Sequence, residues 1–252
     1  MFYEPQRTAY DLNWRMFGIQ VRVHPFFWAI AAILGWGILQ MGFEFLALWI
    51  ACVFVSILIH ELGHVFAGRL FGAYGHIVLY SFGGLAIGSN SLPNRWQRIA
   101  VMLAGPGAGF LLGGLVWLGA QQLDLDEASP LILSAISFLI WINFGWGLLN
   151  LLPVWPLDGG QVNRDLCEWL FRPRGVRIAY GISIAVAGLL AVNALANYSK
   201  HPLPILDQIP FLNRLSGLYT AFMFGFLAYN SYQMLQFENS RRPWDRDGNM
   251  WQ

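Results

Sequence analysis

Long apolar runs dominate the sequence and determine its predicted architecture. A helix that crosses the hydrocarbon core of a bilayer needs about 20 mostly apolar residues, and five runs reach that length. They cover residues 25–43, 99–123, 128–157, 178–199 and 215–237. A sixth run, residues 45–59, meets His60, Glu61 and His64 and then continues to Ala67. We therefore predict an all-α polytopic membrane protein with six transmembrane helices.

Residues 76–88, between the second and third predicted spans, interrupt this helical pattern. Strand-forming residues flank the pair Gly83 and Gly84, which predicts a hairpin. The segment is too apolar for water and too short to span. Non-helical backbone at membrane depth is tolerated only where protein or a wet cavity covers it. We expect a small membrane-embedded β element that forms the wall of a site.

Composition supports a membrane protein and excludes several other classes. Charged residues make up 12% of the chain and hydrophobic residues 56%, whereas soluble proteins average about 25% charged residues. A net charge of +1 provides no electrostatic footprint for nucleic acid, so we expect no such partner. Two cysteines, Cys52 and Cys167, cannot build a disulfide framework.

The basic residues predict how the chain is oriented. Thirteen of the 15 lysines and arginines fall in the amino-terminal segment, in the loops after the second and fourth spans, and in the carboxyl-terminal tail. The opposite side holds Lys200, Arg214 and an acidic loop. Cytoplasmic loops carry the excess of basic residues. We expect an integral, multi-pass protein with both termini in the cytoplasm.

Candidate chemistry begins with His60, Glu61 and His64, which form an HExxH pattern. On a helix, residues i and i+4 share a face, so both imidazoles can bind one metal ion while the glutamate reaches a metal-bound water. A charged residue at the end of an apolar helix is costly and needs a function. The alternative is that the two histidines and the glutamate lie at the headgroup boundary, bind no metal and form hydrogen bonds with backbone or water.

A second candidate is Asp158, which follows the fourth predicted span in the stretch NLLPVWPLDGG that begins at Asn150. We place it at the cytoplasmic end of that span. A catalytic zinc takes three protein ligands and keeps a fourth position for water, and Asp158 would complete the set. Taken alone, an aspartate before two glycines is more typical of a turn or a helix cap.

The motifs HELGH, AGP at residues 104–106 and NLLPVWPLDGG together resemble those of the site-2 protease family of intramembrane zinc metalloproteases. The resemblance covers about residues 22–160. It implies that His60, His64 and Asp158 hold zinc and that Glu61 is the general base. It also implies that Asn150 handles substrate near the metal, and that the strand element pairs with an extended substrate. The residues of that element assigned to substrate are Ser81, Phe82, Gly83 and Gly84.

The apolar runs and the resemblance together lead to expectations about domains and partners. We expect one membrane domain, 1–252, with a catalytic core at 25–160, two further transmembrane helices within 161–237 and a cytoplasmic tail at 238–252. The expected partners are a single-spanning membrane protein as substrate, the lipid bilayer and an accessory regulator. The active-site entrance is expected on the cytoplasmic side. We expect no regulation through PDZ-like or nucleotide-sensing domains.

One departure and several alternatives accompany this prediction. The family often has an asparagine three residues after its Gly-Pro, where this chain has Gly109. A structural zinc site would need a fourth protein ligand; Cys52 lies too far along its helix, whereas Cys167 stays open. A metal transporter or a non-proteolytic zinc membrane protein is the other alternative. We expect Asn143 to bond a neighbouring helix.

Overall fold

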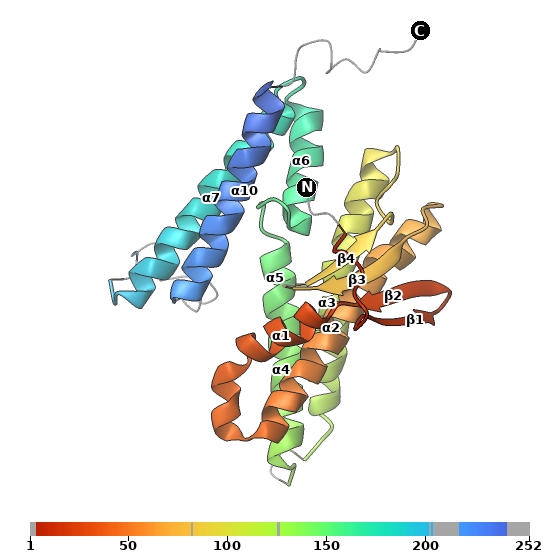
Figure 1. Ribbon diagram of the computed structural model, residues 1–252, viewed down its shortest axis with the longest axis vertical. Coiled ribbons are helices and arrows are strands. Elements are labelled where there is room, and N and C mark those ends of the chain that lie inside the picture. Colours follow the sequence, from red (N-terminus) through yellow and green to blue (C-terminus); the bar gives the residue numbers. More distant parts are fainter. Residues whose placement is uncertain (1–3, 82, 125–126, 202, 204–216, 241–252) are drawn as a thin grey trace. The chain divides into compact units, whose positions relative to one another are not determined.

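The computed structural model describes residues 4–81, 83–124, 127–201, 203 and 217–240. The chain forms two compact units, Met1–Asn150 and Leu151–Gln252, and each is described by itself. Figure 1 shows the elements of both. Among the described helices, four are long and apolar enough to cross a membrane: Phe43–Leu70, Arg95–Ala120, Pro130–Asn150 and Gly175–Tyr198.

The amino-terminal unit contains a four-stranded sheet. Its strands are β1 (Leu12–Met16), β2 (Ile19–Val23), β3 (His76–Tyr80) and β4 (Gly83–Ile87). They lie in the order β1-β2-β3-β4, with antiparallel outer pairs and a parallel β2–β3 pair. The predicted hairpin at 76–88 is confirmed as β3 and β4. Strands β1 and β2 were not predicted from the sequence.

Helix α2 (Phe43–Leu70) is the central helix of this unit. Figure 1 shows the sheet lying beside it and α3 (Arg95–Ala120) running alongside it. Apolar side chains of β2 and β3 pack with side chains of α2 in one buried core, which includes Val21, Ile77, Leu62 and Val65. Burying apolar surface is the main force that holds a sheet against a helix.

Arginine side chains fasten the amino-terminal strands at two points. Arg69, near the end of α2, donates hydrogen bonds of 2.8 Å to the carbonyls of Phe17 and Gly18, in the β1–β2 turn. Arg22 on β2 is buried and donates to Asp11 Oδ2 at 3.0 Å and to Glu4 Oε1 at 2.9 Å. A buried guanidinium needs such partners.

The predicted span at 25–43 is wrong. The segment instead forms α1 (Pro25–Leu34) and a 3-10 helix, η1 (Trp36–Met41). Pro25 begins α1, because its fixed φ suits the first helical position. The helix ends at Gly35, where a side chain would overlap Trp49. Ten residues of α-helix are too short to cross a bilayer.

The predicted fourth span, 128–157, is also corrected. It consists of α4 (Pro130–Trp141), a π-helical turn η2 (Ile142–Trp146) and α5 (Gly147–Asn150). It ends at Asn150, before Pro153 and Pro156, which cannot continue a helix. Asp158 therefore does not end this span but begins another helix, α6 (Asp158–Leu170), in a region predicted as a loop.

The carboxyl-terminal unit contains α6, α7 (Gly175–Tyr198) and α10 (Leu218–Ser240). Helix α7 confirms the predicted fifth span. Helix α10 occupies the predicted sixth span but is not among the four candidate membrane helices, and its polar residues include Asn230 and Gln233. Six spans are thus not confirmed. Residues 215–216 and the tail from 241 lie outside the described residues.

Candidate metal centre

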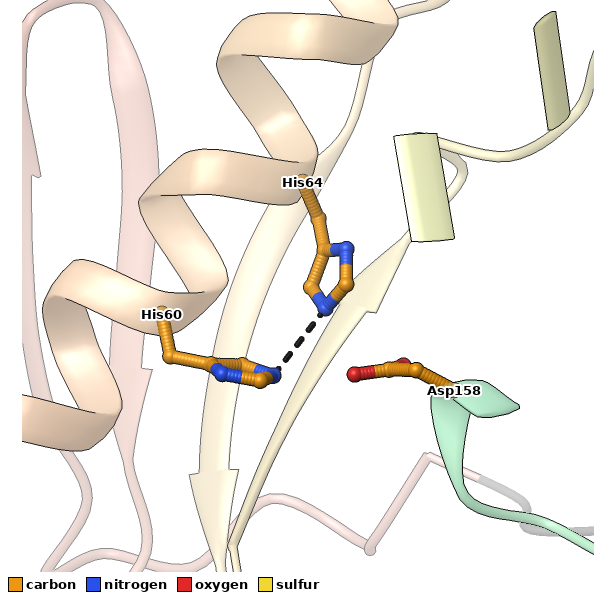
Figure 2. A group of neighbouring side chains, drawn as sticks. All are labelled: His60, His64 and Asp158. Atoms are coloured by element: carbon orange, nitrogen blue, oxygen red, sulfur yellow. Dashed lines mark hydrogen bonds between the residues drawn. The ribbon is translucent and has the colours of Figure 1, made fainter. Parts of the chain in front are cut away.

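Two histidines lie on successive turns of α2, and both are buried. His60 and His64 are 6% and 3% exposed. Their Nε2 atoms face each other at 3.1 Å, as Figure 2 shows. Two nitrogens on one tetrahedral zinc, with bonds of about 2.0–2.1 Å, lie about 3.3 Å apart. The pair therefore fits a metal ion bound between the two rings.

The backbone of α3 sets the tautomer of His64. The Nδ1 atom of this ring lies 2.7 Å from the carbonyl oxygen of Val101. A carbonyl only accepts, so Nδ1 carries the proton and donates it. In the neutral ring Nε2 then keeps its lone pair. Metal-binding histidines typically donate their other N–H in this way, and His64 is thereby prepared to bind through Nε2.

Glycines let α3 approach α2 this closely. A Cβ on Gly105 would overlap the imidazole of His64, and a Cβ on Gly63 would overlap the carbonyl of Ala104. Gly105 belongs to the AGP motif, so the structure gives that motif a physical role: it makes room for the His64 ring. The Val101 carbonyl was missed because backbone groups leave no signal in a sequence.

Glu61 lies between the two histidines in sequence and is also buried, at 5% exposed. Strand β4 packs directly against it: a Cβ on Gly84 would overlap Cγ of Glu61. Any larger residue at position 84 would displace the carboxylate. The second glycine of the predicted hairpin therefore positions the candidate base, whereas the nearest atom to a Cβ on Gly83 is a ring carbon of Trp146 at 3.9 Å.

Asp158 belongs to the carboxyl-terminal unit, where it is the first residue of α6 (Figure 2). It is 9% exposed. A carboxylate is favoured there by the dipole of the helix. The next two glycines pack against the preceding loop, since side chains at Gly159 and Gly160 would overlap the backbone of Leu151 and Val154. The LDGG sequence thus folds the chain tightly at Asp158.

Helix α7 holds the loop before Asp158. The hydroxyl of Ser183 accepts a hydrogen bond from the Trp155 amide and donates one to the Pro153 carbonyl, both at 3.1 Å. Ser183 is 1% exposed. The sequence offered no reason to single out this serine, because its partners are backbone groups about 30 positions away.

The remaining predicted residues lie in different places. Asn150 is the last residue of α5. Ser81 has a positive φ of 46° in the β3–β4 turn, and Phe82 lies outside the described residues. Asn143 donates to Ser56 Oγ of α2 at 2.9 Å, which confirms the expected bond to a neighbouring helix.

These features define a helical membrane protein with a buried histidine pair that suits a metal ion. The sequence model of peptidase family M50 matches residues 48–129 and 120–192 of this chain. The chain belongs to this family, and the family together with the four apolar helices indicates an integral membrane protein.

Two curated relatives are also similar. Zinc metalloprotease MJ0392 of Methanocaldococcus jannaschii is 27% identical over 190 residues, which are 72% of this chain and 54% of that protein. Stage IV sporulation protein FB of Bacillus subtilis is 30% identical over 152 residues, 60% of this chain and 48% of its own. The chain spans about half the length of these relatives.

A solved structure supports the same fold. The site-2 protease from Methanocaldococcus jannaschii aligns with a TM-score of 0.55 and 22% identity, covering 89% of this chain and 94% of that one. The fold is therefore that of a site-2 protease, with the helices and small sheet described above.

Proposed function

We propose that this chain is an intramembrane zinc metalloprotease. Its substrate would be a single-spanning membrane protein, cut within or near the transmembrane segment. The buried, facing imidazoles of His60 and His64, with the buried Glu61 between them in sequence, carry the proposal. The names of the similar metalloproteases support it.

Asp158 is proposed as the third ligand. We propose that His60 and His64 of the amino-terminal unit and Asp158 of the carboxyl-terminal unit together supply the donor atoms for the metal ion. Two imidazoles and one carboxylate are a donor set that suits a catalytic zinc and leaves a fourth position open. Zinc there would lower the pKa of a bound water and polarise the scissile carbonyl.

The protein's own groups handle the proton in this scheme. Hydrolysis breaks the peptide C–N bond, adds the water oxygen to the carbonyl carbon and transfers a proton to the leaving nitrogen. The Glu61 carboxylate accepts a proton from water and returns it to that nitrogen. The Val101 carbonyl keeps His64 in the tautomer that binds through Nε2. Gly84 keeps Glu61 in place.

Strand β4 is proposed to receive the substrate as an added strand. A transmembrane helix hides its carbonyl carbons, and unpaired backbone groups in lipid are costly. Strand addition at a sheet edge would pair the unwound segment. Strand β4 ends the strand order among the described residues and contacts Glu61 through Gly84. Gly83, Gly84 and Asn150 are proposed substrate contacts, together with Ser81 and Phe82.

The orientation proposed from the basic residues places both termini and the site entrance in the cytoplasm. An accessory regulator is proposed as a further partner. Reporter fusions to each terminus test the proposed orientation, because a cytoplasmic terminus is protected from protease added outside the cell.

The decisive experiment compares Glu61→Gln with wild type in zinc content and in cleavage of a membrane peptide. We expect the variant to keep zinc and to lose activity by about 10²–10⁴-fold. Glu44→Gln, at the exposed first turn of the same helix, is the matched control and should behave as wild type. Unchanged turnover in Glu61→Gln would remove Glu61 from the mechanism, and zinc flux without cleavage would support a transporter instead.

A further inference from the structure

A small cavity lies beside His60 within the amino-terminal unit. Ser56, His60, Gly109 and Asn143 line it, together with Trp146 and neighbouring apolar residues. Its volume of about 10 Å³ is close to the minimum that holds one water molecule. A single water molecule therefore fits this space.

Two buried polar side chains face this cavity, and their orientation follows from their hydrogen bonds. The Nδ2 of Asn143 donates to the Leu139 carbonyl at 2.8 Å and to Ser56 Oγ at 2.9 Å. A backbone carbonyl can only accept, so the amide cannot be flipped. Both side chains are 3% exposed.

These bonds leave two groups for a further partner. The amide oxygen of Asn143 points towards Gly109, whose Cβ, if present, would lie 3.5 Å from it. The Ser56 oxygen accepts from Asn143, so its hydroxyl proton is available to donate. Among the described residues, the hydrogen bonds of Ser56 and Asn143 engage neither group. One donor and one acceptor at a cavity of this size match a water molecule.

The span that carries Asn143 contains a π-helical turn. Asn143 lies in η2, Ile142–Trp146, where the wider turn changes the direction in which side chains project. Single π-turns inside α-helices occur frequently at functional sites. An uninterrupted α-helix would rotate the residues beyond this point to other positions.

We propose that Ser56 and Asn143 bind a resident water next to His60 and that this water replenishes the one consumed in each hydrolysis. The supply role rests on the proposed protease function, whereas the water site itself does not. The lining residues belong to three of the candidate membrane helices, so a stored water shortens the wait for resupply through an apolar environment. Gly109 contributes by leaving the space open.

The test begins with a structure of the zinc-loaded full chain at a resolution that shows waters. We expect density within hydrogen-bonding distance of both Ser56 Oγ and Asn143 Oδ1. An empty cavity would overturn the proposal. This result is independent of cleavage, so it also separates the water site from the protease function if wild type cleaves nothing.

Kinetics of Ser56→Ala test the supply role. We expect kcat to fall about tenfold, the effect of one lost hydrogen bond, with unchanged KM and zinc content and with the water density gone. Unchanged kcat would overturn the supply role. Gly109→Leu should fill the cavity and lower kcat in the same way. Gly107→Leu on the same helix, where a Cβ meets nothing within 4 Å, is the matched control.

Discussion

The helix pairs α2–α3 and α7–α10 differ in the space around their glycines. In α2–α3, Gly63 and Gly105 are pressed against the partner helix, and a side chain at either position would overlap it. In α7–α10, a Cβ added at Gly181, Gly188 or Gly225 would meet nothing within 4 Å. At the α2–α3 contact, the tight glycines let the Val101 carbonyl reach His64, whereas these three glycines of α7 and α10 leave room for a side chain.

The largest expected effect is that of Gly105→Ala. The new Cβ would displace the His64 imidazole, so we expect bound zinc to be lost and activity to fall about 100-fold. Gly188→Ala should change stability by less than about 0.5 kcal/mol and leave zinc bound. Metal analysis and thermal unfolding of both variants check this. Normal zinc content in Gly105→Ala would end the distinction between the two helix pairs.

Gly84→Ala should come next, because it moves the base rather than a ligand. Displacement of Glu61 should lower kcat about 100-fold while zinc stays bound. Gly83→Ala, whose added Cβ would have its nearest neighbour at 3.9 Å, is compared in kcat, since a change at this proposed substrate contact should appear in KM. Equal effects of the two substitutions on kcat would argue that the strand, and not the contact with Glu61, matters.

Ser183→Ala tests whether α7 contributes more than packing. It removes both hydrogen bonds that hold the loop before Asp158, at a cost of about 1–3 kcal/mol for buried groups left unpaired. We expect Tm to fall by several degrees, about 2–4 °C per kcal/mol. Ser199→Ala, at the exposed end of α7, should leave Tm unchanged. Equal Tm values for the two variants would show that α7 contributes packing alone.

The smallest effect concerns pH at the amino-terminal segment. Burial disfavours charge on Asp11, but hydrogen bonds from Thr8 and the Arg22 guanidinium outweigh it and lower the pKa of Asp11 below its ordinary value. The folded pKa lies below the unfolded one, so the carboxylate stabilises the fold at neutral pH. This contribution is lost as pH falls below about 4.

Asp11→Asn should therefore lower Tm slightly at pH 7 and narrow the difference between pH 7 and pH 3. Thermal unfolding at both values measures it. Glu127→Gln, in an exposed loop, should keep the wild-type difference. A wild-type pH response in Asp11→Asn would show that other carboxylates dominate.

Structural features that depend on residues close together in the sequence were predicted from local patterns. The i, i+4 spacing of His60 and His64 predicts a shared helical face, and strand-forming residues around Gly83 and Gly84 predict the hairpin. Both are local features, and both are confirmed as structure. The catalytic and metal-binding roles of these residues stay proposals.

Features that depend on distant partners escaped prediction. Strand β2 pairs with β3 across more than 50 residues, and hydropathy carries no trace of that pairing. The run at 25–43 is apolar enough to span, yet Gly35 divides it because Trp49 packs there. For Asn143 the bond to a neighbouring helix was predicted, but its partner, Ser56 of α2, was not.

The strand order has a consequence for inhibitor design. Its two ends, β1 and β4, are separated by three strand spacings, about 14 Å, so a peptide mimetic docked on β1 leaves Glu61 untouched. Only a mimetic that adds to β4 competes for the proposed cleavage register. Such a compound would need an extended backbone with free amides on one side.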